Sequence, residues 1–163
     1  MRRIISVLLE NESGALSRVI GLFAQRGYNI ETLTVAPTDD DTLSRLTLTT
    51  IASDEQSEQI IKQLNKLIEV VRLVDLTDGE YVERELMLIK VKATGSQRAE
   101  VKRTSDIFRG QIVDVSAANY TIQLTGTSRK LDAFVNAISE FTVTEVVRSG
   151  VSGLSRGEKA LAL

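Results

Sequence analysis

The residues with the clearest potential to bind a ligand lie in one short loop, residues 10–16. Asn11 offers an amide donor and a carbonyl acceptor, while Gly14 and Ala15 are small enough for a ligand to approach the backbone closely. If a helix follows, the unpaired N–H groups at its start favour an anion. A free amino acid requires this combination of groups. An ordinary helix cap formed by Asn11 or Ser13 explains the same residues without a ligand.

A second candidate is Asn29, which follows Gly27 and Tyr28 at the predicted start of a strand. Within one βαβ unit, this strand start lies at the end of the sheet opposite to the first loop. Across a symmetric dimer, a site can therefore combine the loop of one chain with the strand start of its partner. A turn that tolerates unusual backbone dihedrals is the alternative explanation for Asn29.

The composition gives little support to catalysis by this chain. The 163 residues include no histidine, which is the commonest general base and metal ligand, and no cysteine. No glycine-rich dinucleotide or phosphate-binding motif is present. The acidic run at residues 39–41 lacks the glycine and the glutamate of an EF-hand loop, so we predict a solvated turn. We expect no enzyme, no metal site and no cofactor on this chain.

The charge and hydropathy patterns exclude two further classes of protein. A formal net charge of −2 does not suit a nucleic-acid binder, and the predicted strand at residues 43–51 lacks the stacking aromatics of an RNA-recognition domain. The apolar run at residues 4–9 is too short for a signal peptide, and no run is long enough to span a bilayer. We expect a soluble cytoplasmic protein without nucleic-acid or membrane partners.

The periodicity of apolar residues predicts two consecutive βαββαβ units. Leu16, Val19, Ile20 and Phe23 recur at helical spacing, and Gly27 stands where a left-handed residue ends a helix. A second helix is expected around residues 60–68. The predicted strands cover residues 4–9, 29–36, 43–51 and 70–76 in the first unit and 86–91, 112–115, 120–124 and 143–147 in the second.

Each unit is expected to form a four-stranded antiparallel sheet with two helices on one face, an α+β arrangement of the ferredoxin-like type. We place the first unit at residues 1–76, a polar linker at 77–80, the second unit at 81–148 and a loose tail at 149–163. Two helices leave the other face of a sheet uncovered, and its edge strands present unpaired backbone groups. We therefore expect at least a homodimer.

Both halves of the chain resemble one known family. Residues 3–23 and 26–35, with Glu10-Asn11-Glu12-Ser13-Gly14-Ala15-Leu16 and Gly27-Tyr28-Asn29-Ile30, are similar to the N-terminal ACT domain of certain small regulatory subunits. These subunits belong to bacterial acetohydroxyacid synthase (acetolactate synthase) of the valine-sensitive type. Residues 84–91, 107–115 and 149–157 resemble the second half of the same family.

The resemblance implies a non-catalytic subunit that associates with a large catalytic subunit. That partner uses thiamine diphosphate, magnesium and FAD to condense pyruvate with pyruvate or 2-ketobutyrate. The small subunit raises its activity and confers feedback inhibition by valine in branched-chain amino-acid biosynthesis. The alternative is a free-standing ACT-type amino-acid sensor that regulates a different enzyme.

The resemblance also implies where the effector binds. In this family it lies between two ACT domains from different chains. The matching residues are Asn11, Gly14, Ala15 and Leu16 on one side and Asn29 and Ile30 on the other. The second half has Ala93-Thr94-Gly95-Ser96 at the corresponding loop, so we expect it to be structural or to face a partner.

Overall fold

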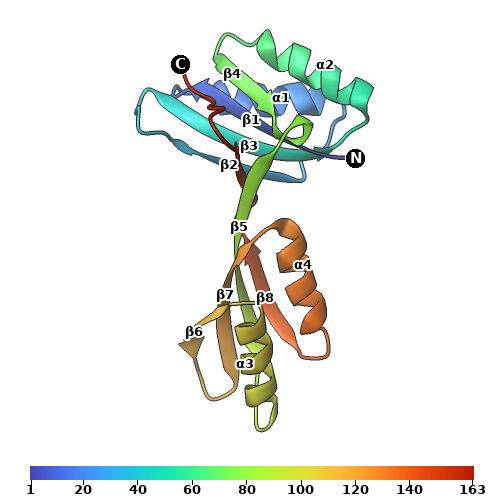
Figure 1. The fold of residues 1–163 in the computed structure, drawn as a ribbon, viewed down its shortest axis with the longest axis vertical. Helices are drawn as coiled ribbons and strands as arrows, with labels where there is room; N and C mark the ends of the chain where they lie inside the picture. The colour runs from blue at the N-terminus through green and yellow to red at the C-terminus, as the bar shows by residue number, and fades with distance from the viewer. The chain divides into compact units, whose positions relative to one another are not determined.

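The computed structural model describes all 163 residues and divides them into two compact units. Unit 1 comprises Met1–Glu83 and Val151–Leu163, and unit 2 comprises Arg84–Gly150. Each unit contains an antiparallel sheet with two helices on one face, as Figure 1 shows. This arrangement confirms the prediction of two ferredoxin-like βαββαβ units.

Unit 1 has the strand order β2-β3-β1-β4. The central strand β1 is buried on both faces, because its odd-numbered residues Ile5, Val7 and Leu9 pack beneath the helices and its even-numbered residues face the other way. The elements are β1 (Arg2–Glu10), α1 (Ala15–Gln25), β2 (Thr32–Pro37), β3 (Leu43–Ile51), α2 (Asp54–Asn65), β4 (Val70–Asp75) and a 3₁₀ turn (Leu76–Asp78).

Unit 2 has the strand order β6-β7-β5-β8 and its own core. Within that core the rings of Phe108 and Phe134 meet edge to face, with 5.4 Å between their centroids. The elements are β5 (Tyr81–Lys92), α3 (Gln97–Ile107), β6 (Gln111–Val115), β7 (Asn119–Gly126), α4 (Ser128–Ala137) and β8 (Val143–Arg148). The longest helix of the chain, α2, has 12 residues, and none is long and apolar enough to cross a membrane.

The ends of the corresponding helices α1 and α3 differ in one respect. Gly27 follows α1 with a φ of +70°, as the sequence predicts. After α3 the left-handed residue is Arg109, with a φ of +59°, rather than the glycine that follows it. Gly110 instead allows close packing, because a Cβ atom there would lie 2.9 Å from the hydroxyl oxygen of Ser105.

The prediction of a loose C-terminal tail is wrong for residues 151–156, which we call the return segment. This segment contains strand β9 (Ser152–Ser155), which pairs with β5, and belongs to unit 1. Gly150, with a φ of +85°, precedes it, and Val151 is fully buried. Gly150 therefore forms a turn, and Gly153 allows a close contact with Leu76.

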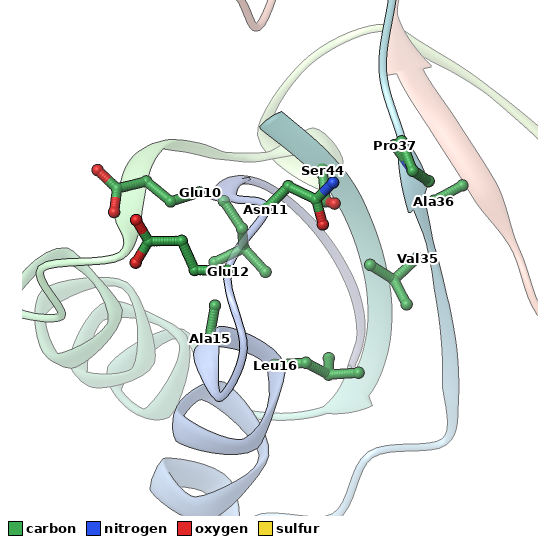
Figure 2. A pocket seen from close by; sticks show the side chains of 10 residues that line it. Glu10, Asn11, Glu12, Ala15, Leu16, Val35, Ala36, Pro37 and Ser44 are labelled. Atoms are coloured by element: carbon green, nitrogen blue, oxygen red, sulfur yellow. The ribbon is translucent and has the colours of Figure 1, made fainter. Parts of the chain in front are cut away.

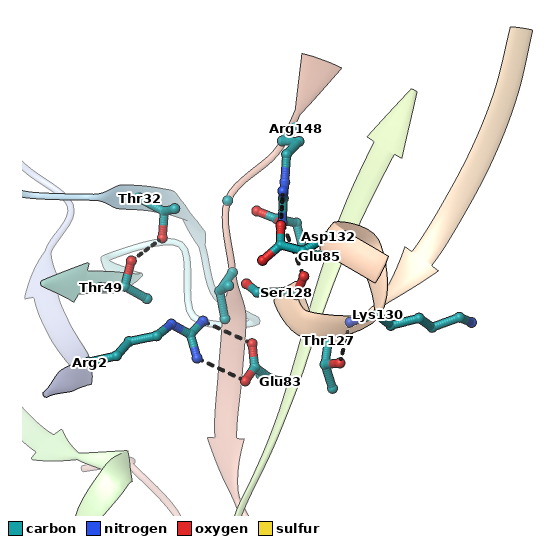
Figure 3. A network of polar contacts seen from close by, with 12 residues as sticks. Arg2, Thr32, Thr49, Glu83, Glu85, Thr127, Ser128, Lys130, Asp132 and Arg148 are labelled. Carbon is teal, nitrogen blue, oxygen red and sulfur yellow. Dashed lines mark hydrogen bonds and ion pairs between the residues drawn. The ribbon is translucent and has the colours of Figure 1, made fainter. Parts of the chain in front are cut away.

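The predicted linker at residues 77–80 does not mark the boundary between the compact units. The 3₁₀ turn occupies its first two positions, and β5 begins at Tyr81. The division falls within β5, between Glu83 and Arg84. In unit 1, Glu83 forms a bidentate ion pair with Arg2 (Figure 3). The two terminal guanidinium nitrogens of Arg2 lie 3.0 and 3.1 Å from the carboxylate oxygens of Glu83.

An ion-pair cluster joins β5, β8 and α4 within unit 2 (Figure 3). Arg148 donates from Nε to the carboxylate of Glu85 at 2.8 Å and from Nη1 to that of Asp132 at 2.6 Å. Desolvation by burial would lower the pKa of Arg148, but the bonds to Asp132 and Glu85 outweigh it and raise that pKa. The carboxylate of Glu85 is buried and therefore depends on this partner.

Replacement of Arg148 by methionine is expected to destabilise unit 2 by about 3 kcal/mol, because it leaves the buried carboxylate of Glu85 without a cation. The double variant Glu85→Gln, Arg148→Met removes the buried charge as well, and should recover most of the loss. Urea unfolding of the two variants and the wild type measures both effects. Equal stability of the single variant and the wild type would contradict the assigned role of Arg148.

Candidate functional site

The loop between β1 and α1 lines a cavity of about 260 Å³ in unit 1 (Figure 2). Three of the predicted site residues, Asn11, Ala15 and Leu16, contribute to its wall. The remaining lining residues are Leu9, Glu10, Glu12, Val35, Ala36, Pro37 and Ser44. The cavity is slightly smaller than the range for drug-sized ligands, which begins at roughly 300 Å³, and therefore suits only a small ligand.

The first turn of α1 has no side-chain cap. Gly14 is the N-cap residue, with a φ of +89°, and no side chain accepts from the N–H groups that follow it. The alternative explanation of the loop, a cap formed by Asn11 or Ser13, is therefore wrong. The helix α2, by contrast, begins with a capping box between Ser53 and Gln56. The open start of α1 is suited to a small anion such as a carboxylate.

Asn11 is held in place by the neighbouring turn. Its backbone N–H donates to the carbonyl oxygen of Thr42, and its side-chain amide nitrogen donates to that of Asp41, both at 2.8 Å. These bonds fix the direction of the side chain and use one of its two N–H donors. The side-chain oxygen is left as the group that can accept from an ammonium.

The wall of the cavity combines apolar and acidic groups. Figure 2 shows the side chain of Leu16, on α1, directed toward that of Val35, on β2, while the side chains of Glu10 and Glu12 extend away from this pair. The apolar pair suits an aliphatic side chain, and the two carboxylates give the loop a negative charge. Together with the open helix start, the wall offers complementary groups for each part of an aliphatic amino acid.

Asn29 and Ile30 lie outside this cavity and precede β2 instead of starting it. The reason is local, because the backbone oxygen of Asn29 accepts from the hydroxyl of Thr50 at 2.6 Å and its side-chain amide donates to Glu31 at 2.9 Å. Asn11 is bonded beside Thr42 and Asn29 beside Thr50, so about 26 Å of strand separates them. A single chain does not bring the two halves of the predicted site together.

The part of the cavity wall that β2 and β3 contribute was not predicted from the sequence. In the sheet Pro37 pairs with Ser44, and Ser44 pairs with Leu9, so these strand ends meet at the β1–α1 loop. Alternation of apolar and polar residues reveals that strands exist. It does not reveal which strands are neighbours, and therefore gave no signal for these residues.

The corresponding loop of unit 2 is closed by a side chain. The guanidinium of Arg98 donates to the carbonyl oxygens of Ala93, Ser116 and Ala117 at 3.0 to 3.1 Å. It also lies over the ring of Tyr120, 4.4 Å from the ring centroid. This cation ties together the backbone that would otherwise surround a ligand.

The acidic run at residues 39–41 forms a turn through its own hydrogen bonds. The carboxylate of Asp40 accepts from the hydroxyl of Thr42 at 2.6 Å and from its backbone N–H at 3.0 Å. These bonds lower the pKa of Asp40, the side-chain bond being the larger cause. The same turn holds Asn11, so the ionised carboxylate helps to set the shape of the cavity mouth.

Two family models together match most of the chain. The model described as the AHAS small subunit-like ACT domain matches residues 5–72, and the model described as the small subunit of acetolactate synthase matches residues 84–157. The first match contains every predicted site residue.

Proteins and a solved structure are similar over nearly the full length. The chain is 63% identical over 162 residues to the acetolactate synthase isozyme 3 small subunit of Escherichia coli, covering 99% of each. It is 45% identical over 159 residues to a probable acetolactate synthase small subunit of Archaeoglobus fulgidus, covering 98% of this chain and 99% of that protein. The crystal structure of the small subunit from Thermotoga maritima matches with a TM-score of 0.87 and 36% identity, covering 98% of this chain and 99% of that one.

Replacement of Thr42 by valine is expected to raise the pKa of Asp40 toward its ordinary value, because the larger of the two hydrogen bonds is lost. In the wild type that pKa is lowered, so the turn keeps its contribution to stability above the ordinary pKa and loses it as the pH falls through the lowered one. NMR titration of the side-chain carboxyl measures both values. An unchanged Asp40 titration in the variant would show that Thr42 does not stabilise the ionised form.

Proposed function

The chain belongs to the family of acetolactate synthase small subunits, and from that premise we propose that it confers feedback inhibition by L-valine on a catalytic large subunit. The family has a regulatory small subunit with an ACT domain and implies a catalytic partner. The observation that carries the proposal is the uncapped start of α1, which opens into a cavity with an apolar wall. The family sets aside the alternative of a sensor for an unrelated enzyme.

The proposed binding mode assigns one part of the cavity to each part of valine. The carboxylate accepts from the N–H groups that follow Gly14, where the helix dipole favours negative charge. The ammonium donates to the side-chain oxygen of Asn11 and is attracted by Glu10 and Glu12. The isopropyl group packs between Leu16 and Val35. Each hydrogen bond to a charged group contributes about 1.5–3 kcal/mol.

We propose that the complete site requires a homodimer. Strand β2 is an edge strand, because it pairs with β3 alone. If two copies pair their β2 strands about a two-fold axis, the strands run antiparallel, and the start of one lies beside the end of the other. Asn29 and Ile30 of one chain then approach the cavity of its partner, beside Val35 and Pro37. This pairing also protects the exposed edge.

Catalysis is expected to reside in the large subunit, with thiamine diphosphate, magnesium and FAD bound there. In this proposal the small subunit activates its partner and makes the activity of that partner depend on the concentration of valine. Valine changes the affinity or activity of the complex only if it favours one packing of the paired ACT domains. A coupling free energy of about 1–3 kcal/mol is sufficient for such regulation.

Replacement of Gly14 by aspartate is expected to weaken valine binding at least about tenfold, because the new carboxylate competes for the N–H groups and repels the ligand. Titration calorimetry of the purified chain measures the change. Gly14→Ala is the matched control, since it imposes the same strain at a φ of +89° without the charge, and no atom lies within 4 Å of the added Cβ. Valine binding by the aspartate variant at wild-type affinity would refute the site.

A mixing experiment tests whether the site spans two chains. Asn11→Ala and Asn29→Ala dimers should each lose valine binding, because every site in either dimer lacks one of the two asparagines. After the two variants exchange subunits, a mixed dimer has one intact site and one doubly altered site. Calorimetry of the mixture should therefore recover binding that neither variant shows alone. If mass spectrometry verifies subunit exchange and the mixture still does not bind valine, a site shared between two chains is contradicted.

A further inference from the structure

The return segment is bound to the helix-free face of the unit 1 sheet by side chains from three strands. Thr34 of β2 donates to the carbonyl oxygen of Val151 at 3.1 Å. Ser6 of β1 and Arg45 of β3 both donate to the carbonyl oxygen of Gly153, at 3.4 and 2.9 Å. Carbonyl groups two residues apart in an extended chain point the same way, so both can face the sheet.

The fit between the segment and the sheet is close. A Cβ atom on Gly153 would lie 2.8 Å from Cδ1 of Leu76 and 3.4 Å from the carbonyl oxygen of Val82. Leu76 is itself buried, so its side chain has little room to move away. Val151 is fully buried as well. The segment is therefore a fitted part of unit 1.

The docked state nevertheless carries a cost. The Nε atom of Arg45 is buried without a hydrogen-bond partner, and desolvation by burial lowers the pKa of this side chain. Strand β2, which supplies Thr34, is held by a single neighbouring strand. A balance between these close contacts and one buried nitrogen without a hydrogen bond allows a modest change in β2 to shift the position of the segment.

The cavity and the return segment contact adjacent residues of the same two strands. Val35 and Ser44 line the cavity, and their neighbours Thr34 and Arg45 bind the segment. Because successive side chains point to opposite faces of a sheet, each strand has one surface toward the ligand site and one toward the segment. A ligand that fixes the end of β2 therefore also fixes Thr34.

We infer that the return segment is a conformational element coupled to the effector cavity through β2 and β3. An effector bound between α1 and β2 holds Thr34 in position and strengthens docking of the segment. The inference deepens the proposed function and rests on it for the identity of the effector.

Hydrogen exchange of the full chain without ligand tests the coupling first. Gly153→Val should displace the segment, because a branched side chain does not fit against Leu76 and Val82. We expect the amides of residues 34–36 to exchange faster by about fivefold or more. Ser152→Ala is the matched control, since its exposed side chain changes the same segment without altering this fit. Unchanged exchange at residues 34–36 in the Gly153→Val variant would overturn the inference.

Exchange with saturating L-valine tests the response to the effector. The amides of the return segment should exchange about fivefold more slowly in the wild type when valine is bound. Thr34→Val removes the donor to Val151 and should abolish this slowing. Thr32→Val is the control, because Thr32 lies on the same face of β2 but bonds to Thr49. A full response in Thr34→Val would overturn the inference.

The ligand-free experiment and the valine experiment together distinguish failure of the inference from failure of the proposed function. Calorimetry on the same wild-type sample establishes whether valine binds. An absence of binding refutes the valine assignment, and the ligand-free arm then decides the coupling by itself. Binding without any change in the return segment supports the effector site and refutes the coupling.

Discussion

The alternation of side chains along β1 and β3, with both faces of the sheet covered, is the constraint on which unit 1 depends. Ile5 and Val7 pack beneath the helices, while Ser6 faces the return segment. A slip of one residue in the register would exchange the two sets and place polar groups in the core. The same register places the end of β1 beside the ends of β2 and β3 and thereby creates the cavity.

The start of α1 lacks the side-chain cap that two of the other three helices have. Such a cap contributes about 1 kcal/mol to helix stability. Ser53 and Thr127 provide one for α2 and α4, whereas Gly14 provides none for α1 and Ser96 none for α3. Of the two uncapped helices, α1 is the one whose first residues, Ala15 and Leu16, line the cavity. In the proposed function a carboxylate ligand bonds to the N–H groups that the missing cap leaves open.

The two units share a topology but differ in the structure of the loop between their first strand and first helix. In unit 1 the first loop lines the cavity, whereas in unit 2 Arg98 donates to backbone carbonyl groups of the equivalent loop and its neighbour. The helix-free face of unit 1 receives the return segment. The comparable face of unit 2 leaves Leu86 and Leu88 each more than one-third exposed. One fold thus serves two different purposes within a single chain.

The sequence by itself determined the two βαββαβ units, because apolar periodicity depends on local geometry. It also singled out the loop at Asn11 as a candidate site, because Gly14 and Ala15 allow a ligand close to the backbone where a helix is predicted to start. Only the tertiary structure decided that β2 and β3 complete the cavity wall, and that Asn29 lies at the far end of the sheet from it. It likewise showed that residues 151–156 return to unit 1. These features depend on strand pairing between residues far apart in the chain, and no local pattern specifies which strands become neighbours.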